Sequence, residues 1–411
     1  MSAHHTTHHK KGHHHVKSWA AWAIVGMCVA AFGLYIGHEW ATLPKPPPPA
    51  FVGPFPPHFV LPHHASSSGV TMAGEPWTRA GFAMVTAVSL PVFEYAHGTV
   101  MADGQFFIGM RDSVGNPFPT NIVVILTDPS DLHKYRVASL GEAGAVESAI
   151  YDDRNDKVYV MLAGNSALRI YSIDPQTYAV STVLSTTSLD TGDRPAIVTD
   201  GTYIYGITNT ERSTVFKVRI SDGALWTDAG GHVPYGHSAA IGVYRGKTEL
   251  YFGGGISHEV EKVDPANLYT IAEIKIPACN MTDDMPFAPI DGRSGYIYVG
   301  CEDNPYGERV RTDDMSVEQF ALPGKSYGLF VYGNDLYNAA RDGYIDAFPG
   351  GDIHKLQRFR VAGGPIPLRP GGSELQVNEL FYADATESMY FTAWLGMPGL
   401  FRVSTTTASD I

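Results

Sequence analysis

Residues Lys157–Leu184 read KVYVMLAGNSALRIYSIDPQTYAVSTVL and contain the pattern of three short β-strands. Val158–Leu162 is a continuous apolar run, which is typical of a strand buried on both faces. A second run, Leu168–Ile173, ends at Asp174-Pro175, where the aspartate accepts backbone N–H groups and the proline presets φ. Tyr178–Leu184 returns as a third, more polar strand. Three strands cannot bury both of their faces alone, so this stretch needs neighbours of the same kind.

The same unit recurs about every 40–50 residues, which is the period of a β-propeller blade. Its mark is an aspartate directly after a β-rich run. The mark occurs at Asp128, Asp174, Asp222 and Asp264, with weaker forms near Asp313-Asp314, Asp352 and Ser404. Seven units fit between Glu75 and Ile411, with expected ranges 92–140, 141–187, 188–231, 232–278, 279–324, 325–364 and 365–411. Phe82–Leu90 precedes them, and we expect it to be the outermost strand of the last unit, where it would close the ring.

The Lys157–Leu184 unit resembles the YVTN-type propeller repeat, in which a Tyr-Val-Thr-Asn strand precedes a Val-x-Val-Ile-Asp strand. Tyr171-Ser172-Ile173-Asp174 keeps the second half, whereas Tyr159-Val160-Met161-Leu162 departs from the Thr-Asn half. The resemblance extends to Tyr296–Leu322 and Leu250–Ile276, and elsewhere it rests on the period. It implies an all-β, seven-bladed β-propeller. It implies no activity, because this fold hosts many functions.

The first segment, residues 1–17, holds seven histidines and three lysines and no acidic residue. Its interrupted histidine pairs have the composition of a metal-binding tract, because neutral imidazole binds transition metals. The alternative is a disordered, weakly basic tail without a ligand.

Residues 18–40 contain an uncharged apolar run, Trp19–Ile36, that is just long enough to cross a bilayer. Lysines precede the run and Glu39 follows it, so the positive-inside rule places the N-terminus in the cytoplasm. A cleaved signal peptide is the competing interpretation, with its nearest candidate cleavage site after Ala41. We expect a retained transmembrane signal anchor, which makes the chain a single-pass membrane protein with its body in the periplasm or on a cell or virion surface.

Residues 41–74 are expected to be a stalk, because the proline density of Pro44–Pro62 favours an extended, semi-rigid spacer. Residues 75–411 are the expected propeller. The chain has 29 Lys and Arg against 42 Asp and Glu, of which only four and one precede Glu75. This acidic excess argues against nucleic acid as a partner. Cys279 and Cys301 flank one expected inner strand, and they form either a disulfide or two buried thiols.

Propeller ligands bind where loops open onto the central channel, so the residues just before each innermost strand are the candidate binding site. These channel-mouth residues are His97, Glu147, Arg194, His237, Asp284, Tyr327 and Asn378. Four of them, His97, Glu147, His237 and Asp284, have side chains that could hold a divalent metal and so activate water or an ester. The alternative is an ordinary polar channel mouth without a ligand.

No catalytic motif of a serine hydrolase, a zinc protease or a dithiol enzyme occurs, so we assign no catalytic residue and no resident cofactor. The sequence favours a membrane-anchored, extracytoplasmic binding or display module for a protein or glycan partner. The enzyme alternative is a metal-dependent lactonase or esterase at the channel mouth. A third hypothesis is an envelope assembly scaffold or a virion membrane protein.

Overall fold

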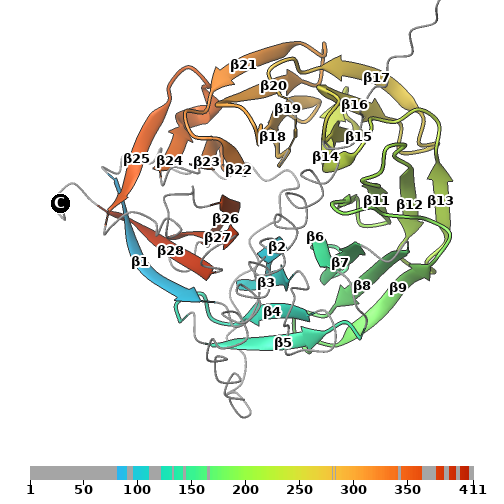
Figure 1. Ribbon diagram of the computed structural model, residues 1–411, viewed down its shortest axis with the longest axis horizontal. Coiled ribbons are helices and arrows are strands. Elements are labelled where there is room, and N and C mark those ends of the chain that lie inside the picture. Colours follow the sequence, from blue (N-terminus) through green and yellow to red (C-terminus); the bar gives the residue numbers. More distant parts are fainter. Residues whose placement is uncertain are drawn as a thin grey trace, which may run out of the picture. The chain divides into compact units, whose positions relative to one another are not determined.

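Antiparallel four-stranded meanders are the repeating element of the fold, and they are arranged as a ring in Figure 1. The computed structural model describes residues 81–89, 96–110, 122–131, 134–141, 145–163, 167–279, 281–282, 284–340, 344–362, 376–383, 388–394 and 399–406. All of these residues lie in one unit, Pro56–Ile411. The expected tail, anchor and stalk lie outside the described residues. Within the described part, no helix has the length and apolarity needed to span a membrane.

Five sheets have four strands each, in sequence order from the ring centre outward. The first is β2 (Ala96–Ala102), β3 (Gln105–Met110), β4 (Ile122–Leu126) and β5 (Tyr135–Ser139). The second is β6 (Ala145–Asp152), β7 (Lys157–Ala163), β8 (Leu168–Ile173) and β9 (Val180–Thr186). The third is β10 (Ala196–Thr199), β11 (Tyr203–Ile207), β12 (Val215–Arg219) and β13 (Leu225–Asp228). The fourth is β14 (Gly236–Tyr244), β15 (Lys247–Gly254), β16 (Glu259–Val263) and β17 (Thr270–Lys275). The fifth is β18 (Phe287–Asp291), β19 (Ser294–Val299), β20 (Tyr306–Arg311) and β21 (Val317–Ala321).

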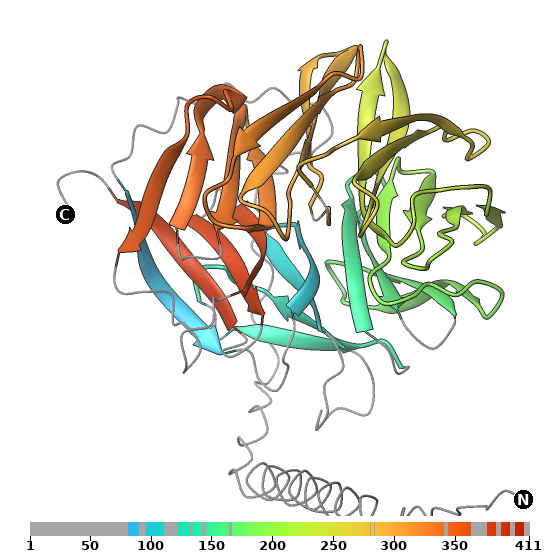
Figure 2. The same ribbon diagram turned by 45° about the horizontal axis from the view of Figure 1, so that its top comes forward.

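The sixth sheet has eight strands in the order β22-β23-β24-β25-β1-β28-β27-β26. Its strands are β22 (Ser326–Tyr332), β23 (Asp335–Ala340), β24 (Tyr344–Phe348), β25 (Gln357–Ala362), β1 (Gly81–Ser89), β26 (Gln376–Ala383), β27 (Ser388–Trp394) and β28 (Gly399–Thr406). A short 3₁₀-helix, η1 (Pro349–Gly351), follows β24. Figure 2 shows β1 in blue between β28 and β25.

The expected count of seven separate units is wrong, because the described strands form six sheets. The last two expected ranges are joined into one sheet where β1 pairs in parallel with β25 at Phe82↔Val361 and Ala83↔Ala362. The expected closing role of Phe82–Leu90 is confirmed, because β1 pairs antiparallel with β28 along its length. The same strand therefore covers the outer edge of β25, which would otherwise expose unpaired backbone groups.

The hydrophobic core lies between neighbouring sheets and repeats around the ring. The second strand of each four-strand set buries a large aromatic residue at 0–3% exposure. These residues are Phe106, Tyr159, Tyr205, Tyr251, Tyr298, Tyr337 and Tyr390. Each buried cluster joins two consecutive sheets; one contains Tyr251 together with Ile297 and Val299 of the next sheet. No sheet buries both faces alone, so each one is stabilised by its neighbours.

An aromatic contact joins the first and last sheets. The rings of Phe106 and Tyr390 lie 4.7 Å apart between centroids. The buried Tyr390 hydroxyl donates to the Pro129 carbonyl at 2.7 Å, across 261 residues of sequence. This contact adds a specific polar bond to the apolar burial that closes the ring.

The expected turns at Asp128, Asp174, Asp222 and Asp264 are confirmed as backbone-capping turns at the end of the third strands, whereas the weaker form expected near Ser404 is wrong, because Ser404 lies inside β28. Asp174 accepts from the backbone N–H groups of Gln176 and Thr177 at 3.0 and 2.7 Å, and the Lys157 ammonium lowers its pKa to about 2. Asp128, Asp222 and Asp264 each accept one backbone N–H in the same way. A polar side chain of this kind satisfies the turn locally, which explains why the motif could be recognised in the sequence.

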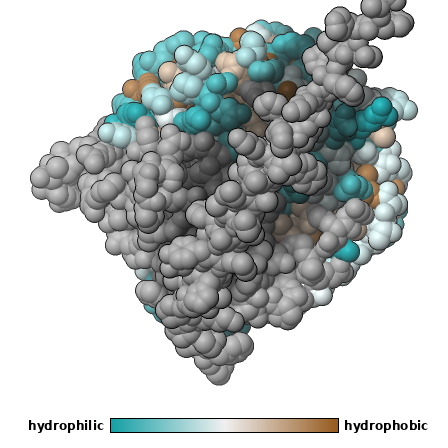
Figure 3. All heavy atoms as spheres, viewed as in Figure 1, coloured by the Kyte–Doolittle hydropathy of each residue, from teal (hydrophilic) through white to brown (hydrophobic). Residues whose placement is uncertain are grey.

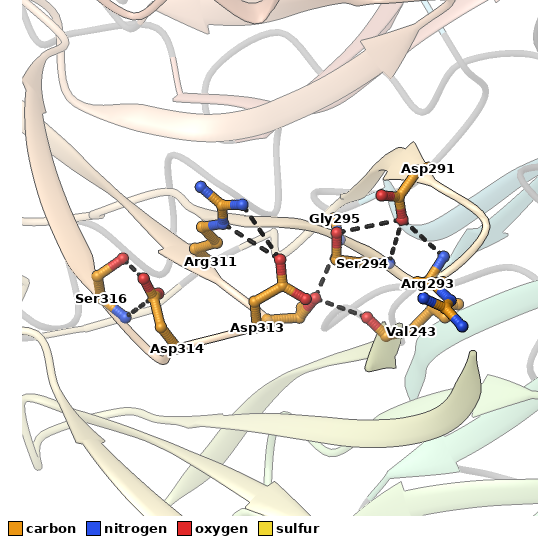
Figure 4. Close-up of polar contacts among 10 residues, drawn as sticks. Val243, Asp291, Arg293, Ser294, Gly295, Arg311, Asp313, Asp314 and Ser316 are labelled. Atoms are coloured by element: carbon orange, nitrogen blue, oxygen red, sulfur yellow. Dashed lines mark hydrogen bonds and ion pairs between the residues drawn. The ribbon is translucent and has the colours of Figure 1, made fainter. Parts of the chain in front are cut away.

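Figure 4 shows how such turns also join the fourth and fifth sheets. Asp291 accepts from the backbone N–H groups of Arg293 and Ser294 at 2.7 and 2.8 Å. The buried Thr312 hydroxyl donates to the Val243 carbonyl of β14 at 2.6 Å and accepts from Gly295 N–H at 2.9 Å. Outside its grey residues, Figure 3 shows a mainly hydrophilic surface with scattered hydrophobic residues.

Candidate functional site: the mouth face

Two sets of loops lie at the same end of the antiparallel sheets: those entering an innermost strand and those joining a second strand to a third. In the sheets from β10 to β21, these loops are residues 187–195, 208–214, 229–235, 255–258, 276–286 and 300–305, with 280 and 283 outside the described residues. We call them the mouth face. It contains Arg194 and Asp284 and borders His237, the second residue of β14.

Hydrogen bonds link the mouth-face loops from one sheet to the next. Between the third and fourth sheets, Tyr235 N–H donates to Thr210 O at 2.8 Å and the Asn209 side chain donates to Gly236 O at 3.1 Å. Gly255 N–H donates back to Tyr235 O at 2.7 Å. Loops held by several such bonds have little freedom, so this face is a rigid surface.

The links continue into the fifth and sixth sheets. The buried Ser238 hydroxyl of β14 donates to the Thr282 hydroxyl at 2.8 Å. Thr282 forms an isolated β-bridge with Cys301, and Cys301 O accepts from Ser326 N–H at 3.3 Å. Cys279 and Cys301 are joined by a disulfide, with their Cα atoms 5.1 Å apart. The mouth face is thus fixed covalently as well as by hydrogen bonds.

Arg194, His237 and Glu302 form a charged cluster on this face. Arg194 Nη1 lies 3.2 Å from His237 Nε2 and 3.5 Å from Glu302 Oε2. A guanidinium can only donate, so Nε2 of His237 accepts and a neutral His237 ring carries its proton on Nδ1. The Glu302 side chain is 7% exposed and that of Arg194 is 22% exposed. Burial weakens solvent screening, so this ion pair orients Arg194 more firmly than a surface pair would.

Of the seven expected residues, Arg194 and His237 are in direct contact in the structure. Glu302 joins them, and it was not among the residues predicted from the sequence. Glu302 follows β19, the second strand of its sheet, whereas the seven expected residues were all placed just before innermost strands. Its one sequence signal was its position next to Cys301.

Most of the expected mouth residues lie on β-bulges in innermost strands. The pairing register shifts around His97 in β2, Glu147 in β6, His237 in β14 and Tyr327 in β22. In β26 the shift follows Asn378, so the bulged residue is its neighbour Glu379. A bulge re-aims a side chain, and bulges are frequent beside functional sites. Glu147 is buried at 5% exposure, whereas the side chains of His97, Tyr327 and Asn378 lie outside the described set.

No group of three or more His, Cys, Asp or Glu side chains that could hold a metal occurs in the described part of the chain. The proposed ligand set includes His97, whose side chain is outside that part. The metal hypothesis for His97, Glu147, His237 and Asp284 therefore stays a prediction.

Behind the mouth face, three consecutive sheets bury a carboxylate at the third residue of the third strand: Glu261, Glu308 and Asp346. Glu261 lies 2.9 Å from His232 Nδ1 and accepts from the Thr270 hydroxyl at 2.9 Å. Asp346 accepts from Arg358 at 2.9 Å and from the Asn338 side chain at 3.0 Å. These two carboxylates are compensated by hydrogen-bond donors, as burial requires.

Glu308 differs, because the donor described for it is the Ala278 backbone N–H, at 3.2 Å, and no side-chain donor compensates it within the described residues. Burial raises the pKa of Glu308 to about 7, and the Ala278 N–H opposes that rise only in part. Ala278 precedes the disulfide at Cys279, so Glu308 supports the same loop that the disulfide fixes.

Comparisons with known proteins support the fold. No family model matches the chain, so the resemblance to the YVTN-type repeat stays a prediction. No curated protein matches it either. Among solved structures, the WD40 β-propeller domain of Doa1 is 11% identical with a TM-score of 0.55, over 78% of this chain and 96% of that chain. A chain of the mitotic checkpoint complex is 9% identical with a TM-score of 0.58, over 82% of this chain and 99% of that chain. At such identities the likeness shows a β-propeller and nothing finer.

Proposed function

We propose that this chain is a binding or display module that presents the mouth face of its propeller to a protein partner. The observation that carries the proposal is the set of hydrogen bonds that links the mouth-face loops of the sheets from β10 to β22. A preformed surface loses little conformational entropy on binding, so rigid loops favour recognition. The fold supports the same function, because one similar solved structure is a chain of a protein complex. A glycan is the other ligand class that a rigid polar face of this kind would suit.

The Arg194–His237–Glu302 cluster gives this face a fixed polar centre. The contacts with His237 and Glu302 hold the planar guanidinium of Arg194 in a defined geometry. Arginine held in a defined geometry is frequent among residues that dominate interface energies.

Site-specific photo-crosslinking tests the proposal. A photoreactive residue at Glu211, which is exposed on the mouth face, is compared with one at Asp222, which is exposed at the opposite end of the same sheet. In cells of the native source, position 211 is expected to give discrete protein adducts and position 222 is not. Equal adducts at both positions, or none at either, would contradict the mouth-face proposal.

We also propose that residues 18–40 anchor the module in a membrane, with residues 1–17 in the cytoplasm and the propeller outside. The support comes from the apolar run Trp19–Ile36 and the charges that flank it. N-terminal sequencing of the mature protein is the test: a first residue beyond Ala41 would show a cleaved signal peptide.

A metal-dependent lactonase or esterase is the second candidate. It is favoured by the bulges that contain His97, Glu147 and His237 near the start of their innermost strands. Metal analysis of the purified protein is the test. Stoichiometric Ca²⁺ or Zn²⁺ that is lost on replacing His237 and Asp284 would favour this enzyme over the binding module. The third hypothesis, an envelope assembly scaffold or virion membrane protein, predicts stable association with other envelope proteins in cross-linking.

A further inference from the structure

Two large hydrophobic side chains are exposed at the mouth end of the fourth and fifth sheets. Ile256 is 53% exposed at the loop between β15 and β16, and Tyr306 is 44% exposed at the start of β20. Pro277 and Pro305 are exposed in the chain segments between them. We call Ile256, Pro277, Pro305 and Tyr306 the apolar tips. The other large hydrophobics exposed in the described part lie on outermost strands or toward the opposite end.

Hydrogen bonds connect the segments that carry the apolar tips. Ile276 N–H donates to His258 O at 2.9 Å, which joins the loop of Ile256 to the segment that contains Pro277. The Asn304 side chain donates to Ala278 O at 2.8 Å, which joins that segment to Pro305 and Tyr306. The Cys279–Cys301 disulfide closes the same junction.

The loop that carries Ile256 is also fixed by close backbone packing. A Cβ atom at Gly254 would lie 2.9 Å from Pro234 O, and one at Gly255 would lie 3.0 Å from Tyr235 O. Gly253-Gly254-Gly255 is therefore a tight approach between loops. Such packing keeps Ile256 exposed at a defined place, and a rigid exposed anchor is a feature of interface hot spots.

Four carboxylates lie on the same mouth face and are exposed: Asp190, Asp193, Glu211 and Asp303. None of the four has an ion-pair partner within the described residues. Among the described mouth-face residues, Arg212 is the arginine or lysine that is not paired with a carboxylate there, and Lys325 lies just beyond the face, before β22. The unpaired charge on the mouth face is therefore negative, which complements a basic partner.

We propose that the apolar tips are a docking surface for a basic protein segment that inserts aliphatic side chains between Ile256 and Tyr306. This inference rests on the proposed binding function and names its partner class. The tips supply the buried anchors, and the carboxylates of the mouth face attract the partner and set its orientation.

The experiment measures binding of two fluorescent peptides of about twelve residues, one alternating Lys with Leu and the other alternating Lys with Ser, at about 0.1 M salt. The full chain is used in detergent. The test variant carries Ile256→Ser and Tyr306→Ser. The matched control carries Ile290→Ser and Tyr269→Ser, which replace an isoleucine and a tyrosine exposed by 47% and 64% at the opposite end of the same two sheets.

The Lys-Leu peptide is expected to bind more tightly than the Lys-Ser peptide. The test variant is expected to bind the Lys-Leu peptide at least about tenfold more weakly than the unchanged protein, and the control variant is expected to bind it equally well. The double variant Asp303→Asn with Glu211→Gln is expected to bind both peptides more weakly. The double variant Asp222→Asn with Asp314→Asn, at the opposite end of the sheets, is expected to bind both with unchanged affinity. Any of three results would overturn the inference: the test and control variants lose the same affinity, the protein does not prefer the Lys-Leu peptide, or the Lys-Leu peptide does not bind. If the inference fails but position 211 still gives photo-crosslinks, the proposed binding function stands and the partner belongs to a different class. If position 211 gives no photo-crosslinks either, both the inference and the proposed function are rejected.

Discussion

Replacing Glu308 by Gln is expected to stabilise the protein at pH 8 and to leave it nearly unchanged at pH 4.5. The carboxyl group is 1% exposed, and burial raises its pKa from 4.5 to about 7. Below pH 4.5 it is protonated in both the folded and the unfolded chain, so it carries no penalty. Between pH 4.5 and pH 7 the unfolded chain ionises first, and the free energy of unfolding falls. Above pH 7 the free energy of unfolding falls no further. The difference between a pKa of 4.5 in the unfolded chain and about 7 in the folded chain corresponds to a total loss of about 3 kcal/mol.

Glutamine suits this test because its side-chain oxygen still accepts the Ala278 N–H while its amide cannot ionise. Urea unfolding of both proteins at pH 4.5, 6 and 8 gives the difference between them as a function of pH. The matched control is Glu318→Gln, because that side chain is 44% exposed and the Arg309 guanidinium lowers its pKa. A Glu308→Gln effect that is the same at every pH would refute the argument, since it would show that the substitution acts through packing and not through ionisation.

Three further changes test the contacts that hold the ring and its mouth. Cys279→Ser with Cys301→Ser is expected to lower the free energy of unfolding by about 3 kcal/mol, because the bond closes a 22-residue separation; urea unfolding measures this, and no loss would show that the bond does not constrain the unfolded chain. His232→Ala leaves the Glu261 carboxylate buried with one fewer donor, and a loss of about 3 kcal/mol is expected in the same assay. A neutral result there would mean that water replaces the imidazole. Tyr390→Phe removes the bond to Pro129 and is expected to cost about 1 kcal/mol; thermal unfolding checks it, and an unchanged Tm would show that the closure is purely apolar.

The local features of this fold could be predicted from the sequence, because they are encoded by adjacent residues. Asp174-Pro175 specifies its turn without help from distant residues. Because such turns recur at the period of a propeller blade, the β-propeller fold could be predicted from them. The closing role of Phe82–Leu90 could also be predicted, since a β-rich segment without a neighbouring partner must pair elsewhere.

Other features that depend on pairing between distant segments could not be predicted. The junction of β25 with β1 changes the number of sheets, yet it rests on two residue pairs far apart in sequence. The bulge in β26 falls one residue past Asn378, because a bulge is set by the register of the partner strand. Glu302 reaches Arg194 from a different sheet, and no spacing rule links the two.

Hydrogen exchange at single-residue resolution tests the central claim, which is that the mouth-face loops form one rigid surface. The amides of Tyr235, Gly255 and Glu302 lie in loops but donate to backbone carbonyls of other loops. They are expected to exchange as slowly as the strand amides of β15. Exchange at the rate of freely exposed loop amides would contradict the account, because the binding face would then have to be ordered by its partner.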